Sequence, residues 1–468
     1  GQCGNQVGTH FWNLARQELN EISKQSPEYV SSTCIETFFE TQKSNESLKP
    51  RAVMIDMEEG VINEIHKQNH SLNYYEITDS YGSGNNWAYG YFHYGLKHYS
   101  KIYDVIQKAA ESCDDLQSFF VLHSLGGGTG SGVGTFVLSE ILKDEYSQID
   151  KLCFPVLPSD NFDDITTSPY NTLFALSKLN QNADCILPMH NEALLQIFNR
   201  ISKKSTFKDD TRMSFSGIND IIAHVLLNLT TSSRFHGDMN VDLSELTVNL
   251  VPYRNLNFLV SSQSPVLPNH TTLLTSIKEN SNNCLLKLYQ HVSDIELKLH
   301  TNLATACFFR GNLLISDIQS SITSFKNTLK YISWNEDSFK IGHSYAPPMV
   351  TRKDVISLNQ SQNNSVLMIN NTTAITEPLL KVIRNVKRLY KKKKMRNQNY
   401  FPNKGMAQNK AHFHHYLSVP GFEQSMVAES EEVLLSTIAA YRDLDQEDQE
   451  KAKGGFDTDL FFENNIIY

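Results

Sequence analysis

A short glycine-rich run constrains this chain more than any other feature of its sequence. The run Gly126-Gly127-Gly128-Thr129-Gly130-Ser131-Gly132 lies between Ser118–Ser124, a predicted buried strand, and Val133–Tyr146, a predicted amphipathic helix. Glycines let backbone N–H groups approach an anion, and the N-terminus of the following helix carries partial positive charge. We expect the hydroxyls of Thr129 and Ser131 to add donors. The run therefore predicts a phosphate-binding loop.

A flexible linker and a P-loop each account less well for this run. A flexible glycine linker rarely interrupts a strand–helix unit. A P-loop would require a Gly-Lys-Ser or Gly-Lys-Thr end, and no such lysine follows here. The predicted loop is therefore a phosphate site of another kind.

The pattern of apolar residues predicts several packed units. Residues 1–215 alternate short apolar runs with helical patterns, which is typical of a parallel sheet covered by helices. Residues 216–249 contain a long buried helix, Ser216–Thr231, and a loop. Residues 250–375 read as a second α/β unit, and residues 376–468 as C-terminal helices. Further strands are expected at Arg51–Asp56, Lys151–Leu157, Asp184–Met189, Asn257–Ser261, Thr305–Arg310, Phe339–Tyr345 and Ser365–Asn370, and helices at Pro169–Asn182, Glu192–Ser202, Thr376–Lys394 and Ser425–Leu444.

The chain opens with the glycine turn Gly1–Gly4, followed by a predicted helix over Val7–Leu19. Such a turn normally follows a strand. We therefore expect a first strand that precedes Gly1 and is missing from this sequence, which would leave its neighbours without ladder partners.

Composition excludes some functions. A chain of 468 residues is too long for one ordinary core. The net charge of -9 argues against a general nucleic-acid binder. No apolar run approaches the roughly 18–20 residues needed to cross a bilayer, and no secretory leader is recognised, so we expect a soluble intracellular protein without membrane partners. The seven scattered cysteines form no CxxC pair and are expected to be reduced.

Further motifs occur in the order found in one known family. They are GQCGNQVG (Gly1–Gly8), GSGNNWAYG (Gly82–Gly90), GGGTGSG (Gly126–Gly132), NVDLSE (Asn240–Glu245), NLVPY (Asn249–Tyr253), FFRG (Phe308–Gly311), INNTTAI (Ile369–Ile375) and HHY (His414–Tyr416). Over essentially its whole length the chain resembles the tubulin family. The resemblance implies an α/β, tubulin/FtsZ-like fold: a Rossmann-like GTP-binding domain with a parallel sheet, a central helix, a second α/β domain and C-terminal helices. It also implies GTP or GDP and Mg²⁺ as cofactors.

The resemblance assigns roles to individual residues. Phosphate contacts would come from Gln2, Cys3, Ser83, Gly84, Asn85, Ser124, Gly127, Gly128, Thr129 and Gly130. Asp56 and Glu58, one residue apart at a strand end, can reach one magnesium–water cluster, although a solvated acidic turn accounts for them equally well.

The guanine base would be read by amide side chains, because its edge presents both donors and acceptors. Asn191 and Asn219 match guanine-contacting positions of tubulins, and Phe215 stands where the family usually has a stacking tyrosine. Taken alone, both asparagines would more often be helix caps. Two departures weaken the match: Ser168 replaces a ribose-contacting glutamate, and His190 replaces an acid beside Asn191.

Glu245 is the candidate catalytic residue. It lies in the segment that, in tubulin polymers, reaches the nucleotide of the next subunit, and a carboxylate there can orient a water for attack on the γ-phosphate. Any GTPase activity would then be completed across a longitudinal contact. The alternative is a charged loop without catalytic duty.

Of the tubulin branches, the chain most resembles the epsilon class, with the delta class as runner-up. The resemblance rests on the acidic loop ending in Thr167-Ser168-Pro169-Tyr170-Asn171, on Ala183–Pro188, and on Ala411–Leu417. The C-terminus is too apolar for the glutamate-rich tail of α and β chains. The segment Ser261–Ser276 is short for a lateral loop. Residues 391–410 form a basic insertion, which is either a solvated loop or a docking site for an acidic partner.

The resemblance implies a GTP-binding structural constituent of the microtubule cytoskeleton, acting in the cytoplasm at centrioles or basal bodies of cilia. Expected partners are other tubulins, such as delta-tubulin or αβ-tubulin, and centriolar proteins. The alternatives are a non-polymerising accessory tubulin of the delta class, an autonomous GTPase switch and a Rossmann dehydrogenase. The sequence lacks the Walker A lysine and the NKxD motif that a GTPase switch would need. It also lacks the acidic ribose partner that follows the glycine loop in a Rossmann dehydrogenase.

Overall fold

The computed structural model describes most of the chain. The described residues are 1–25, 27–30, 32–41, 48–68, 74–159, 165–204, 215–266, 300–335, 339–348, 364–390 and 411–452. Three features of the sequence fall largely or wholly outside them: the basic insertion 391–410, most of the segment 261–276, and the C-terminal segment 454–468.

Parallel strands form the N-terminal part of the molecule. β5 (Ser118–Ser124) pairs in parallel with β6 (Asp150–Leu157), and β7 (Cys185–Ile186) and β8 (Met189–His190) pair in parallel with successive parts of β6. β3 (Val53–Ile55) and β4 (Tyr75–Ile77) form a separate parallel pair. β6 is buried beyond its first residue, as expected for a strand covered on both faces. The predicted α/β class is thereby confirmed.

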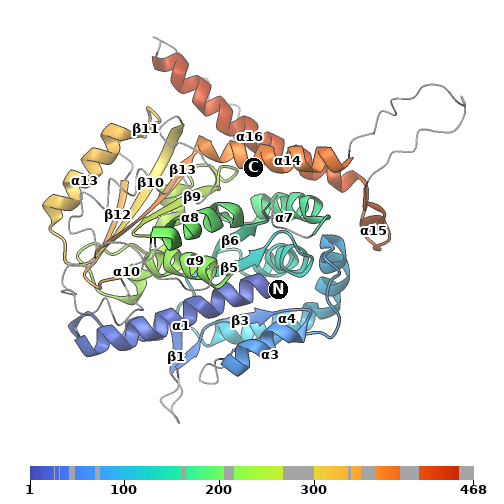
Figure 1. Cartoon of the computed structure of the whole chain (residues 1–468), viewed down its shortest axis with the longest axis horizontal. Coiled ribbons are helices and arrows are strands. Elements are labelled where there is room, and N and C mark those ends of the chain that lie inside the picture. The colour runs from blue at the N-terminus through green and yellow to red at the C-terminus, as the bar shows by residue number, and fades with distance from the viewer. Residues whose placement is uncertain are drawn as a thin grey trace, which may run out of the picture.

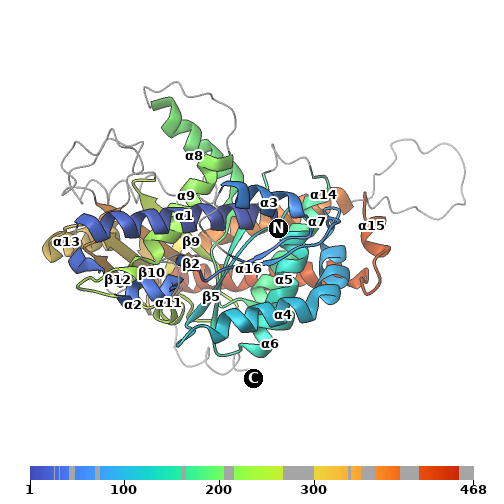
Figure 2. The same ribbon diagram turned by 90° about the horizontal axis from the view of Figure 1, so that it is seen from below.

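Helices cover both sides of these strands. Figure 2 shows α1 on one side and α4 to α6 on the other. The helical elements of this part are α1 (Gln2–Gln25), η1 (Pro27–Tyr29), α2 (Ser32–Phe38), α3 (Glu59–Gln68), η2 (Tyr89–Gly95), α4 (Leu96–Glu111), η3 (Thr129–Val133), α5 (Gly134–Phe136), η4 (Val137–Leu142), α6 (Lys143–Glu145), α7 (Ser168–Asn182) and α8 (Asn191–Lys204). β1 (Phe39–Thr41) and β2 (Leu48–Pro50) pair antiparallel beside them.

A cavity of about 1290 Å³ lies between β3 and β5 and is also lined by the first half of α1. Among the described strands, β3 and β5 do not pair with each other. A further strand beside them is what we expected from the turn at Gly1–Gly4, and that expectation stays a prediction.

A second, mixed sheet is centred on β10 (Thr301–Arg310). β13 (Ser365–Thr372) pairs antiparallel with β10 and with β9 (Leu259–Ser264), while β12 (Phe339–Ser344) and β11 (Lys330–Tyr331) pair in parallel with β10. Every residue of β9, β10 and β13 is buried. Figure 1 shows this sheet at the left with α13 (Ile315–Thr328) outside it, and α11 (Leu243–Leu250) contacts β10.

Helix α9 (Phe215–Leu229) joins the two halves of the molecule. From Gly217 to Leu229 all its residues except Asp220 are buried, and it contacts α1, α8 and three strands of the second sheet. The predicted buried helix is confirmed. A short α10 (Thr231–Arg234) follows it.

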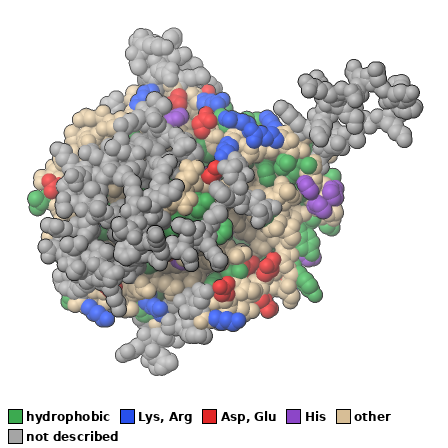
Figure 3. Space-filling model, viewed as in Figure 1, with side chains coloured by type: hydrophobic (Ala, Val, Ile, Leu, Met, Phe, Trp, Pro, Cys, Tyr) green, Lys and Arg blue, Asp and Glu red, His purple; other side chains and the backbone are tan. Residues whose placement is uncertain are grey.

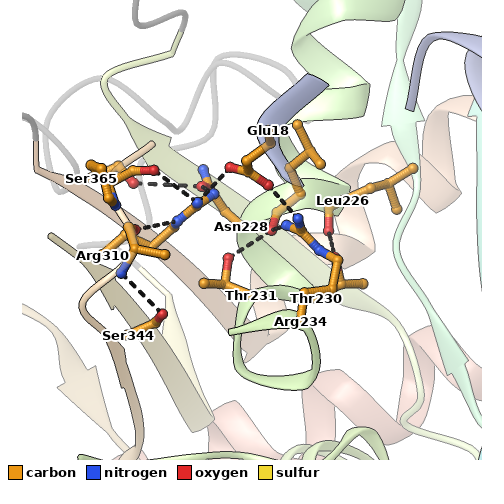
Figure 4. Close-up of polar contacts among 12 residues, drawn as sticks. Glu18, Leu226, Asn228, Thr230, Thr231, Arg234, Arg310, Ser344 and Ser365 are labelled. Carbon is orange, nitrogen blue, oxygen red and sulfur yellow. Dashed lines mark hydrogen bonds and ion pairs between the residues drawn. The ribbon is translucent and has the colours of Figure 1, made fainter. Parts of the chain in front are cut away.

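A buried ionic cluster links α1 to this central region. Both carboxylate oxygens of Glu18 are bound, one by Arg234 of α10 and one by Nη2 of Arg310 at 2.5 Å. Figure 4 shows Glu18 between the two guanidinium groups. Arg310 also donates to Asn228 Oδ1 at 3.2 Å. Because every charge has a partner, burial of the cluster is tolerated, and it ties α1, α9, α10 and β10 together.

The C-terminal helices are α14 (Thr376–Tyr390), α15 (His414–Leu417) and α16 (Ser425–Ala452), with η9 (Thr373–Ile375) before α14. α14 and α16 pack against α7 and run along the top of Figure 1. No helix in the described ranges is both long and apolar enough for a bilayer crossing.

Several element boundaries differ from the predictions. The strand predicted over 184–189 is divided in two, because Pro188 has no N–H for the ladder. β9 begins at Leu259 rather than Asn257, whose side chain instead donates to the carbonyl groups of Asn180 and Ala183. Cys153, Cys185 and Cys307 are buried, Cys3 and Cys113 are half-buried, and none of these five forms a disulfide.

Candidate nucleotide site

The glycine loop follows the carboxyl end of β5 and packs tightly against a second loop, residues 82–87. A Cβ atom on Gly128 would lie 2.5 Å from the backbone nitrogen of Asn86 and 2.6 Å from Ser83 Oγ. The Ser83 and Thr129 hydroxyl oxygens are 2.9 Å apart and hydrogen-bonded. Gly128 is therefore required so that the two loops can meet.

The second loop has an unusual backbone. Gly84 and Asn85 are consecutive left-handed residues, with φ of 59° and 51°. Glycine enters this region freely, and asparagine enters it more readily than most residues. By contrast with Gly128, a Cβ on Gly127 would meet, among the described residues, only Asn85 Oδ1, at 3.6 Å. The loops are thus closed together at Gly128, and space remains beside Gly127.

The first turn of α1 lies against the glycine loop. Gln2 and Cys3 begin this helix, and a Cβ on Gly1 would lie 3.0 Å from the backbone nitrogen of Gly130. Burial raises the pKa of Cys3 to about 11, so its thiol is neutral. A neutral group at a helix N-terminus leaves the partial positive charge there uncompensated, which favours an anion.

One expected donor is not available. Ser131 is fully buried and its hydroxyl donates to the carbonyl oxygen of Gly127, so the prediction that Ser131 faces the phosphate is wrong. Back-bonding of a serine hydroxyl to a carbonyl one turn earlier satisfies it locally. Thr129 keeps a half-buried position, bonded to Ser83, and Ser124 is half-buried at the end of β5.

The two acidic residues differ in exposure. Asp56, at the end of β3, is buried, and its Oδ2 has no hydrogen-bond partner within the described residues. Glu58 is exposed and its carboxylate lies close to Gly82. The part of the chain that the structure describes holds no group of three or more His, Cys, Asp or Glu arranged for a metal. Mg²⁺ typically takes one or two carboxylates plus phosphate oxygens, so this pair fits a nucleotide-dependent ion.

The base-site candidates lie on α8 and α9, which are in contact. The two helices approach closely at Gly217, where a Cβ atom would lie 2.2 Å from the Phe198 ring. Asn191 is the first residue of α8. Phe215 begins α9 and is 62% exposed, which leaves its ring open for stacking. Asn219 is buried and is the fifth residue of α9, which begins one residue before the predicted start at Ser216. Ser168, the substitute for the ribose-contacting glutamate, is buried at the start of α7, and His190 is buried at the end of β8.

Glu245 lies on a helix rather than in a loop, because α11 begins at Leu243. Its carboxylate is about half exposed and pairs with Lys340 Nζ of β12 at 2.6 Å. Lys340 belongs to no local motif, so the sequence gives no sign of this partner. Glu245 therefore faces solvent on the surface of α11, where another molecule can reach it.

Asn171, which the sequence marks only as a feature of the epsilon class, connects both loops. It is fully buried on α7 and donates to the carbonyl oxygens of Asn85 and Gly126, each at 2.8 Å. A buried asparagine aimed at two glycine-rich loops has no sequence signature, because its partners are far away in the chain.

Comparison with known proteins agrees with this geometry. Residues 1–199 match the GTPase domain of the Tubulin/FtsZ family, and residues 255–385 match the tubulin C-terminal domain. The chain belongs to the tubulin family. Tubulin epsilon chains of Mus musculus and Homo sapiens are each 35% identical to it, over 95% of this chain and 94% of theirs. A tubulin alpha chain of Eremothecium gossypii is 33% identical over 84% of this chain and 88% of its own. The predicted resemblance to the epsilon class of tubulins is confirmed.

Proposed function

We propose that this chain is a specialised tubulin that binds GTP or GDP with Mg²⁺ and serves as a structural subunit of centriolar or basal-body microtubules. The observation that carries nucleotide binding is the pair of loops closed at Gly128 and open at Gly127, next to the first turn of α1. Neutral backbone donors and a helix N-terminus suit a phosphate chain.

In the proposed site, Gln2, Cys3, Ser83, Gly84, Asn85, Ser124, Gly127, Gly128, Thr129 and Gly130 surround the phosphates. Asp56 and Glu58 hold Mg²⁺, which neutralises phosphate charge. Asn191 and Asn219 read the guanine edge, and Phe215 stacks on the base. All of these residues except Asn219 belong to the proposed nucleotide domain, residues 1–215. Asn219 lies at the start of the central-helix segment, residues 216–249. The intermediate domain, 250–375, and the C-terminal helices, 376–468, follow.

Hydrolysis, in this proposal, requires a second subunit. Glu245 lies on the exposed surface of α11, paired with Lys340, and not with any residue of the glycine loop. A neighbouring tubulin bound end to end would bring its own nucleotide to this carboxylate, which would orient the attacking water. Partners are other tubulins, with delta-tubulin or αβ-tubulin as candidates, and centriolar proteins. The cytoplasmic and centriolar location rests on the resemblance to the epsilon class.

The test is a binding measurement with the purified protein, comparing GTP, GDP, ATP and NAD in the presence of Mg²⁺. We expect selective binding of GTP and GDP. Preferential binding of NAD would instead support a dehydrogenase, and binding of none would refute the nucleotide assignment.

Phosphate release is then followed with and without αβ-tubulin. We expect release only with the partner, and its loss in Glu245→Gln. Glu377→Gln is the matched control, because Glu377 also lies in the first turn of a helix, is 55% exposed and pairs with a cation, Arg384, at 3.5 Å. Release by the isolated protein at the same rate would point to an autonomous GTPase.

A further inference from the structure

Asn171 uses its whole hydrogen-bonding capacity at the junction of four segments. Its Nδ2 donates to Asn85 O and Gly126 O, and its Oδ1 accepts from Trp87 N at 2.8 Å and from the Tyr416 hydroxyl at 2.5 Å. An asparagine side chain offers two donor hydrogens and two acceptor lone pairs, so none is left over. The amide is thereby held in one orientation.

Tyr416 connects this network to α15, a short helix at the surface. It lies on α15, 245 residues away in the chain, and its hydroxyl is completely enclosed. Around it, His412 just before α15 and His414 and His415 on α15 are exposed, and the histidines in Figure 3 gather on that side of the molecule. A second link runs beside the first, because Asn86 Nδ2 donates to the backbone carbonyl of His415 at 3.0 Å.

The contacts bear directly on the left-handed residue of the second loop. Asn85 is held at φ of 51° while its carbonyl oxygen accepts from Asn171 Nδ2 and from Thr167 Oγ1 at 3.0 Å. Although asparagine enters this region more readily than most residues, the conformation still has a cost, which contacts from the surroundings offset. The amide of Asn171 supplies part of that constraint on one loop and, through Gly126, orients the other.

We infer that Asn171 and Tyr416 are positioning residues of the nucleotide site, through which α15 sets the geometry of both phosphate loops. The inference rests on the proposed function. Neither residue needs to touch the nucleotide. A displacement of α15 would shift the two phosphate loops, because Tyr416 and Asn86 connect the helix to them.

The molecule contains a nearly identical pair in another place, which serves as an internal control. Asn371 Nδ2 donates to Leu250 O at 2.8 Å and to Leu256 O at 2.7 Å, and its Oδ1 accepts from the Tyr441 hydroxyl at 3.1 Å. Tyr441, on α16, is also fully enclosed. This pair holds the end of α11 instead of the phosphate loops.

The experiment compares Tyr416→Phe with Tyr441→Phe in the full-length protein. Each removes one buried hydroxyl and keeps the ring, so the losses in thermal stability without nucleotide should be similar. We expect Tyr416→Phe to weaken GTP binding by about three- to tenfold, since one buried hydrogen bond is at stake, while Tyr441→Phe leaves GTP affinity unchanged. Equal GTP affinities of the two variants would overturn the inference.

A second measurement uses Asn171→Ala alone and combined with Tyr416→Phe. If the hydroxyl acts through the amide, the double variant should bind GTP no more weakly than Asn171→Ala. Additive losses would show independent action and refute the coupling. A wild-type protein that does not bind GTP would refute the proposed function itself, which is a different outcome from equal affinities of the variants.

Discussion

Two buried polar regions lie near opposite ends of α1 and differ in how completely their groups are paired. At Glu18 every charged group has a partner: Arg234 donates to Glu18 and to the Leu227 carbonyl, and Arg310 donates to Glu18, Asn228 and the Ala346 carbonyl. At the other end, Asp56 keeps a buried carboxylate oxygen without a partner among the described residues, and a Cβ on Gly127 would meet only Asn85 Oδ1 there, at 3.6 Å. Figure 4 shows the first region.

The difference separates architecture from binding. A buried carboxylate oxygen without a hydrogen-bond partner is costly, so a site that keeps one is suited to a ligand or ion that supplies the partner. A cluster that satisfies itself has nothing left to offer a ligand. On this reasoning, the Glu18 cluster stabilises the fold, and the region of Asp56 and the glycine loop is the one that we propose for nucleotide and metal.

The largest expected effect is on the Glu18 cluster. Glu18→Gln would leave two buried guanidinium groups without an anion, and we expect the free energy of unfolding to fall by about 3–5 kcal/mol. Urea denaturation followed by circular dichroism measures it. The control Glu377→Gln, at an exposed pair, should change stability by about 1 kcal/mol or less. A similar small change at Glu18 would remove the contrast between the two regions.

The same substitution predicts a pH dependence. Burial alone would raise the pKa of Glu18, but the guanidinium groups of Arg234 and then Arg310 outweigh it, so the pKa lies below its ordinary value of 4.5. A lowered pKa in the folded state stabilises the protein above the unfolded pKa, and this is lost as the pH falls through the folded one. The stability difference between wild type and Glu18→Gln should therefore shrink below pH 4.5.

An intermediate effect is expected at the glycine loop. Gly128→Ala forces its Cβ against Asn86 and Ser83, and overpacking of this kind should cost about 1–3 kcal/mol of stability. Gly127→Ala meets one distant atom of the described chain, so its stability should stay within about 0.5 kcal/mol of wild type. If the space beside Gly127 receives phosphate, however, its GTP affinity should still fall. Thermal unfolding measures the effect of each variant on stability, and GTP titration measures its effect on affinity. An unchanged GTP affinity in Gly127→Ala would mean that the phosphates bind elsewhere.

Little change in stability is expected at Asp56. Because its Oδ2 has no partner to lose in the described part of the chain, Asp56→Asn should alter the free energy of unfolding by about 1 kcal/mol or less. Its GTP affinity should become insensitive to EDTA, whereas the wild type should bind GTP more weakly when Mg²⁺ is removed. Glu59→Gln, an exposed acid nearby, should keep the magnesium dependence. A large destabilisation by Asp56→Asn would make Asp56 a structural residue like Glu18.

The class of fold and the location of the glycine loop between a strand and a helix follow from the amino-acid sequence alone. These depend on local patterns: β5 coincides with the predicted strand Ser118–Ser124, and the glycine run follows it directly in the chain. Local steric rules of glycine and the alternation of strands and helices are legible without a structure.

The pairing of polar side chains, by contrast, depends on the folded chain. Arg310 meets Glu18 across 292 positions of the chain, and Tyr416 meets Asn171 across 245. The prediction for Ser131 failed because burial turned its hydroxyl toward the Gly127 carbonyl, and Lys340 lies beside Glu245 although no motif connects them. A hydrogen bond depends on distance and direction in space, which a one-dimensional pattern does not contain.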